Sequence, residues 1–155
     1  MTGPSPEAIL AAEKLQQSSE SQLLEELGAR ARAVQSDPAL GAHYDLELAP
    51  DDTVMGWRED ALELGRQLFS RWEREAYNLL CGAADDDTAD RKKLGEAFGV
   101  SDVIVAASIS TALAASFGLA APVAAVIAAI LVKRFFRPGY EEFCRFWGKT
   151  LDQPA

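Results

Sequence analysis

The sequence predicts an all-α protein, a compact bundle of about six helices around a central Ala-rich apolar helical hairpin. Two observations support this prediction. Residues 103–132 carry no charge over thirty positions, and eleven of these positions are alanine. Segments with the three- and four-residue apolar spacing of amphipathic helices lie on both sides of this run. A helix that is apolar all round is buried in protein or in lipid, so whatever covers the run organises the rest of the chain.

Composition excludes several classes of function. The 155 residues are a single-domain length, with room for one substantial core. The formal net charge of −9 argues against a nucleic-acid partner, because phosphate binding depends on clustered Lys and Arg. The first residues lack the basic start and apolar core of a signal peptide, so we expect a cytoplasmic protein. Abundant alanine and arginine suggest a bacterial source.

Two short helices are predicted in residues 1–38, the N-terminal helical pair. Ser5 has the position of an N-cap for the first, and Ser19 with Gln22 has the spacing of a capping box for the second. The second helix has a narrow apolar stripe, which either packs on the main bundle or contacts a partner. Three residues of that stripe are our first candidates for a partner contact: Leu23, Leu27 and Val34.

Residues 39–52 are predicted to be an irregular connector between this pair and the main bundle. Tyr44, Leu46 and Leu48 alternate with acidic residues, which indicates one extended segment. The single histidine, His43, is interpreted as a surface residue.

The main bundle is predicted over residues 53–151 and begins with the longest helix, from Val54 to about Leu80. The run Asp51-Asp52-Thr53 is expected to cap it. Apolar residues follow two faces of this helix, so we expect it to lie along the apolar hairpin and shield it.

The acidic run at residues 85–90 lacks the ligand spacing of a calcium-binding loop, so we expect no metal there. Helix capping explains it instead: Asp87 or Thr88 is expected to cap a short helix from Arg91 to Phe98.

The hairpin is predicted over residues 103–136, with its turn at Gly118 and a second arm that starts at Pro122. Three alternatives explain its burial: the chain's own helices, release of the hairpin into a bilayer, or a constitutive membrane span. For the membrane alternatives the candidate segment contains four apolar residues and a basic flank: Ala114, Ala125, Ile127, Ile130, Lys133 and Arg134.

A last amphipathic helix is predicted from Tyr140 to about Leu151. Its aromatic face, with Tyr140, Phe143 and Trp147, is our second candidate contact surface. In a soluble fold these rings form a cap on the bundle, and in a membrane they form an interfacial belt.

Two cysteines, Cys81 and Cys144, lie in apolar helical segments. We expect buried free thiols, with a disulfide between two helices as the alternative. The chain contains no zinc spacing, phosphate loop, dinucleotide fingerprint or nucleophile elbow, so we expect neither a cofactor nor an enzymatic activity.

These observations favour a non-enzymatic helical module that acts by protein contact, as a regulator, adaptor or assembly subunit with a protein partner or by self-association. The alternative is a membrane-associated effector that inserts the hairpin into a bilayer or forms a pore. An exposed contact surface is required by the first hypothesis, and a releasable hairpin by the second.

Overall fold

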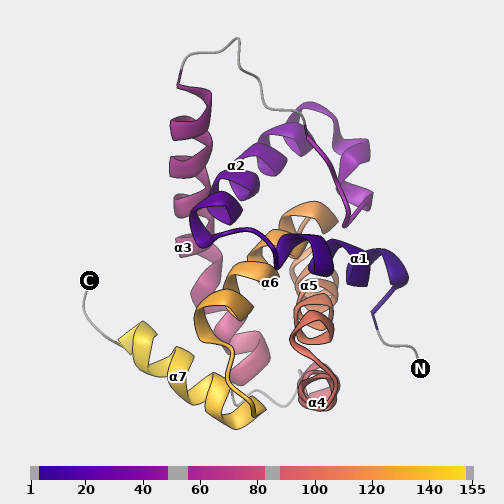
Figure 1. Ribbon diagram of the computed structural model, residues 1–155, viewed down its shortest axis with the longest axis vertical. Helices are drawn as coiled ribbons and strands as arrows, with labels where there is room; N and C mark the ends of the chain where they lie inside the picture. The colour runs from indigo at the N-terminus through magenta and orange to yellow at the C-terminus, as the bar shows by residue number, and fades with distance from the viewer. Residues whose placement is uncertain (1–3, 49–55, 83–87, 153–155) are drawn as a thin grey trace.

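The computed structural model describes residues 4–48, 56–82 and 88–152, and these form seven α-helices and one 3-10 helix, with no strand among them (Figure 1). The all-α bundle predicted from the sequence is therefore confirmed. In chain order the elements are α1 (Pro6–Leu15), α2 (Glu20–Ser36), η1 (Pro38–Ala42), α3 (Trp57–Cys81), α4 (Thr88–Phe98), α5 (Asp102–Phe117), α6 (Ala121–Phe135) and α7 (Tyr140–Asp152).

Three helix starts have capping hydrogen bonds, and those at Ser5 and Ser19 confirm the prediction. The Ser5 side chain accepts a hydrogen bond from the backbone N–H of Ala8, at 3.2 Å. Ser19 and Gln22 form the complete capping box, with each side chain accepting from the other's backbone N–H. Ser101 accepts from the N–H of Ile104 at 3.2 Å and starts α5. Each cap satisfies a backbone donor that has no partner within its own helix.

Two other starts differ from the prediction. The helix α3 begins at Trp57, with Gly56 at the N-cap in the left-handed region at φ 78°, a conformation that glycine adopts without a Cβ clash. The predicted cap at residues 51–53 lies outside the described residues. The helix α4 begins at Thr88 instead of Arg91, and residues 85–87 of the acidic run also lie outside the described part.

The predicted apolar hairpin consists of α5 and α6, and it forms the centre of the bundle (Figure 1). Gly118, at φ 66°, ends α5 in the left-handed conformation typical of helix C-termini, and Pro122 lies in the first turn of α6. Every residue of α6 except Lys133 and Arg134 is buried. The helices α1, α2, α5 and α7 all pack on α6, so the chain's own helices cover it.

The long helix α3 does not shield the hairpin as predicted. It packs mainly on α2, and α2 in turn packs on α6. The reason is a pair of glycines at the helix crossing. A Cβ atom at Gly28 would overlap the carbonyl oxygen of Ala61, and one at Gly65 would overlap that of Leu24. The two backbones therefore lie in contact, and α3 meets the hairpin through single side chains, such as Trp72 stacked on Phe117 at 5.4 Å.

The far end of the hairpin from its turn is covered by an aromatic cluster, defined here as Phe98, Phe135, Phe136, Tyr140, Phe143 and Trp147. Ring centroids in this cluster lie 5.2 to 5.9 Å apart, within the range of favourable aromatic pairs.

A disulfide joins Cys81, the last residue of α3, to Cys144 of α7 beside this cluster, with their Cα atoms 5.6 Å apart. The expectation of free thiols is thus wrong. The two cysteines lie 63 residues apart in the sequence, so their proximity depends on how α3 and α7 pack.

Candidate functional site

Arg30 of α2 is the most deeply buried charged residue in the described part of the chain, with 4% of its surface exposed. Its Nε donates to the Glu26 carboxylate at 2.7 Å, and its Nη1 donates to the carbonyl oxygens of Tyr44 and Pro122, both at 3.1 Å. Its Nη2 donates to the carbonyl oxygen of Leu46 at 2.9 Å. A buried guanidinium is costly unless its charge and its donors are satisfied. Arg30 therefore ties α2 both to the segment after η1 and to the first turn of α6.

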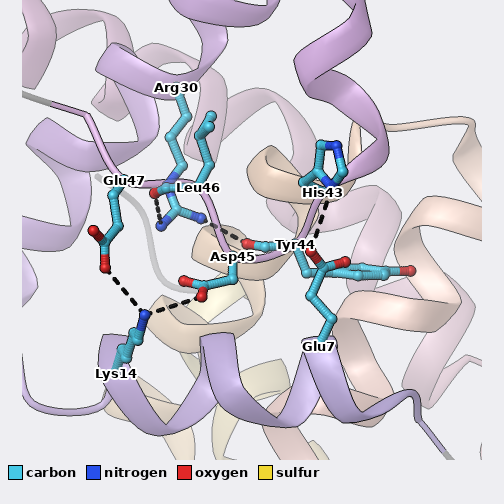
Figure 2. A network of polar contacts seen from close by, with 8 residues as sticks. All are labelled: Glu7, Lys14, Arg30, His43, Tyr44, Asp45, Leu46 and Glu47. Carbon is cyan, nitrogen blue, oxygen red and sulfur yellow. Dashed lines mark hydrogen bonds and ion pairs between the residues drawn. The ribbon is translucent and has the colours of Figure 1, made fainter.

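The segment that Arg30 holds, residues 43–48, is called the strap below. It passes between α1 and α2, and Figure 2 shows its contacts with both helices. On the α1 side, Lys14 Nζ donates to Asp45 Oδ2 at 2.9 Å and to Glu47 Oε1 at 3.1 Å. At the start of the strap, His43 Nδ1 lies 3.4 Å from the Glu7 carboxylate. The strap is thus held by one cation from each helix.

Lys14 acts here as a fixed cation. Hydrogen bonds from its ammonium to Asp45, and next to Glu47, raise the pKa of Lys14 above its usual value of 10.5. The amine is therefore protonated at neutral pH, and it cannot serve as a base or nucleophile while the strap is bound.

Beside the strap lies an open cleft with a volume of about 550 Å³. Strap residues form one wall, Lys14 and Leu15 of α1 a second, and α2 a third, while Arg58 lies at the start of α3. The lining is mixed: Leu15, Leu46 and Leu48 contribute apolar surface, and Glu25 and Arg58 contribute charges that have no ion pair within the described residues. The cleft has the size of a ligand site, with both apolar and charged contacts available.

No group of three or more His, Cys, Asp or Glu residues that could hold a metal ion occurs in residues 4–48, 56–82 and 88–152. The residues that line the cleft include neither histidine nor cysteine. The arrangement can therefore bind by charge, by hydrogen bonds and by apolar contact.

The first predicted contact surface must be revised. Leu23 and Leu27 have no exposed surface and belong to the core, because α2 lies between α3 and α6 and both sides of its stripe are covered. Val34 is half-buried, beside Gly41 of η1. The narrow stripe thus faces the chain's own hairpin.

The second predicted surface is also largely internal. Phe143 and Trp147 have no exposed surface, and Trp147 Nε1 donates to the Glu73 carboxylate at 3.2 Å. Tyr140 is half-buried and donates a hydrogen bond from its hydroxyl to the carbonyl oxygen of Leu80. These rings form the cap expected for a soluble fold, so the predicted partner contact is not exposed at Phe143 or Trp147.

The candidate membrane segment lies at the centre of the bundle. Ala125, Ile127 and Ile130 are buried, and Ala114 is half-buried.

The basic flank of this segment contacts the N-terminal helical pair. Lys133 Nζ donates to the carbonyl oxygen of Gln16 at 2.9 Å. Arg134 pairs with the Glu20 carboxylate at 2.9 Å and lies over the Phe69 ring at 4.6 Å. Both cations therefore stabilise the packing of the N-terminal pair on the hairpin.

Sequence reasoning missed Arg30, which was not among the candidate site residues. One signal did point to this site: the alternation of Tyr44, Leu46 and Leu48 with acidic residues falls on the strap, although the chain bends at Tyr44 and Asp45 and is not extended throughout as predicted. The spacing of Glu26 and Arg30 also matches an i,i+4 ion pair, which forms.

Within the described residues, no helix is both long and apolar enough to cross a membrane. No protein-family model matches the chain, and comparisons with curated proteins and with solved structures found no significant match.

Proposed function

We propose that the protein is a non-enzymatic interaction module that binds another protein through the cleft beside Arg30. The observation that carries this proposal is the strap: the surface formed by α1 and α2 holds a peptide segment without regular secondary structure by a buried guanidinium and a surface ammonium. An open cleft of about 550 Å³ continues from that segment. Surfaces that hold extended peptides by main-chain hydrogen bonds and side-chain pockets are a recurrent form of protein recognition.

The chemistry of the lining supports binding over catalysis. The ammonium of Lys14 is held in its charged form, and Arg30 has its donors engaged. Glu25 and Arg58 offer one charge of each sign to a partner. Charges of both signs beside the apolar side chains of the lining favour one orientation and one class of partner.

Site-specific photo-crosslinking in the cells that naturally make the protein tests this function. A photoreactive phenylalanine analogue replaces Gln22, an exposed residue in the cleft lining, and in a matched control it replaces Gln67, an exposed residue of α3 outside the lining. We expect a discrete protein adduct from position 22, absent from position 67, and weakened by Arg58→Glu. Equal labelling at both positions, or no adduct at position 22, would contradict the proposal.

A second candidate function is insertion of the α5–α6 hairpin into a bilayer. The observation in its favour is that α6 is buried along its whole apolar length beneath amphipathic helices, as a sheltered insertion element would be. At 16 and 15 residues, α5 and α6 are each shorter than the roughly 20 residues of a typical span, which makes this the weaker proposal.

Dye release from anionic lipid vesicles tests the second candidate over a range of pH. If insertion occurs, the wild-type protein releases dye and Ala114→Arg abolishes release, because a charge in the hairpin opposes entry into hydrocarbon. Ala114 is half-buried, so its arginine variant is more compatible with folding than Ala125→Arg. A wild-type protein that releases no dye at any pH rejects insertion.

A further inference from the structure

The strap has no regular secondary structure and bends at Tyr44 and Asp45, and it makes alternating contacts with α1 and α2. Arg30 contacts the carbonyl oxygens of Tyr44 and Leu46, two residues apart. Lys14 contacts the side chains of Asp45 and Glu47, again two residues apart. Alternate groups of the strap therefore point toward the same cation. Figure 2 shows the two acidic side chains directed to Lys14 while Arg30 meets the backbone.

Arg30 and Lys14 bind different features of the strap. Arg30 binds main-chain oxygens, which every residue carries, so its contacts select a backbone conformation without selecting sequence. Lys14 binds two carboxylates, so its contacts select acidic side chains at alternate positions. The Tyr44 ring adds an apolar anchor, since it packs against the hydrophobic core. Together they define a pattern: an aromatic residue followed by acidic residues one and three positions later.

We propose that the groove formed by Arg30 and Lys14 recognises an acidic segment of a partner protein with this pattern, and that the strap occupies the groove as an internal competitor. This inference rests on the proposed interaction function and names the class of its partner. The pattern is carried by the strap itself, as Tyr44-Asp45-Leu46-Glu47.

Tethering sets the strength of the competition. A segment joined to its own receptor by a short linker has an effective concentration on the order of millimolar, so a free peptide competes poorly with it. Weakening the strap without changing the groove should therefore raise the affinity for the peptide.

The test is fluorescence polarisation with a labelled peptide that has the sequence of residues 43–48. The protein variants are wild type, Asp45→Asn/Glu47→Gln, and a matched control, Glu141→Gln/Glu142→Gln, which removes two exposed acidic charges from α7. We expect the strap variant to bind the peptide roughly two- to tenfold more tightly than wild type, the gain that two weak surface ion pairs allow. The control variant should bind as wild type does.

A second pair of measurements tests the assigned contacts. Adding Lys14→Ala to the strap variant should remove its gain in peptide affinity. A peptide with Asn and Gln at its acidic positions should bind the strap variant more weakly by the same factor. In nitrogen-labelled protein, the Nε–H resonance of Arg30 should shift on addition of peptide to the strap variant.

Equal peptide affinity in all three proteins, or affinity that ignores the acidic positions of the peptide, overturns the inference. If adducts at position 22 persist in that case, the interaction function stands and the partner is of another class. If those adducts are also absent, both proposals fail.

Discussion

The two ends of the central hairpin are held in place by different physical means. At the turn end, Arg30 and Lys14 hold the strap against α1, α2 and the start of α6 by hydrogen bonds and ion pairs. At the opposite end, the aromatic cluster and the Cys81–Cys144 disulfide hold α7 against α3, α4 and α6. Ionic contacts can exchange with water or with another ligand, whereas buried rings and a covalent bond cannot. We therefore infer that the turn end is the one suited to reversible binding.

The largest expected effect is at the aromatic end. Replacement of both cysteines in Cys81→Ser/Cys144→Ser opens a loop of 63 residues and should lower the free energy of unfolding by about 4 kcal/mol, by the loop-entropy relation. Urea denaturation under oxidising conditions measures the difference. Wild type treated with a reducing agent should match the variant, and an unchanged stability in both would show that the bridge does not form.

The next largest effect is at the turn end. Arg30→Met removes a buried cation from Glu26 and from three carbonyl oxygens. This substitution should lower the free energy of unfolding by about 3 kcal/mol. The cost is at the low end for a broken buried pair because the Glu26 side chain is 32% exposed and can regain water. Denaturant unfolding compares the Arg30→Met variant with Arg32→Met, which replaces an exposed arginine of the same helix. The Arg32→Met variant should lose little unfolding free energy. Equal losses in the two variants would contradict a special role for Arg30.

A smaller effect isolates one polar contact within the aromatic end. Tyr140→Phe removes the hydrogen bond to the carbonyl oxygen of Leu80 but keeps the ring, and it should cost about 1 kcal/mol. Burial raises the pKa of the Tyr140 hydroxyl above its usual value of 10.0, so the neutral form is favoured in the folded state. The contribution of the Tyr140 hydroxyl to the free energy of unfolding is therefore present below pH 10 and should fall as the pH rises further. If the difference in unfolding free energy between wild type and Tyr140→Phe stays constant above pH 10, the hydrogen bond of Tyr140 is not the source of that difference.

The smallest effect concerns Lys14 and is best seen as a pH dependence. The pKa of Lys14 is raised in the folded state, so its ion pairs contribute below pH 10.5 and are lost as the pH rises through the folded-state value. The stability difference between wild type and Lys14→Met should therefore shrink in alkaline solution. Lys93→Met, at an exposed position of α4, is the control and should show no comparable pH dependence.

Much of the fold could be predicted because its signals are local. The caps at Ser5, Ser19 and Ser101 and the turn at Gly118 each depend on residues within a few positions of one another. Of the candidate site, only the alternation of residue types along the strap could be recognised, since it is also a local pattern. The groove that holds the strap could not be predicted from such signals.

The sequence by itself therefore determined the helices, several of their ends and the uncharged hairpin at the centre, because hydrogen bonds and side-chain periodicity along one chain segment set them. The tertiary structure alone decided which surfaces are covered. Arg30 meets Pro122 across 92 positions, Cys81 meets Cys144 across 63, and the α2–α3 contact depends on two glycines from different helices. Such contacts follow from how helices pack in space. Packing buried Leu23 and Leu27, two of our candidate contact residues, and it left open the cleft beside the strap, which we propose as the site for a partner.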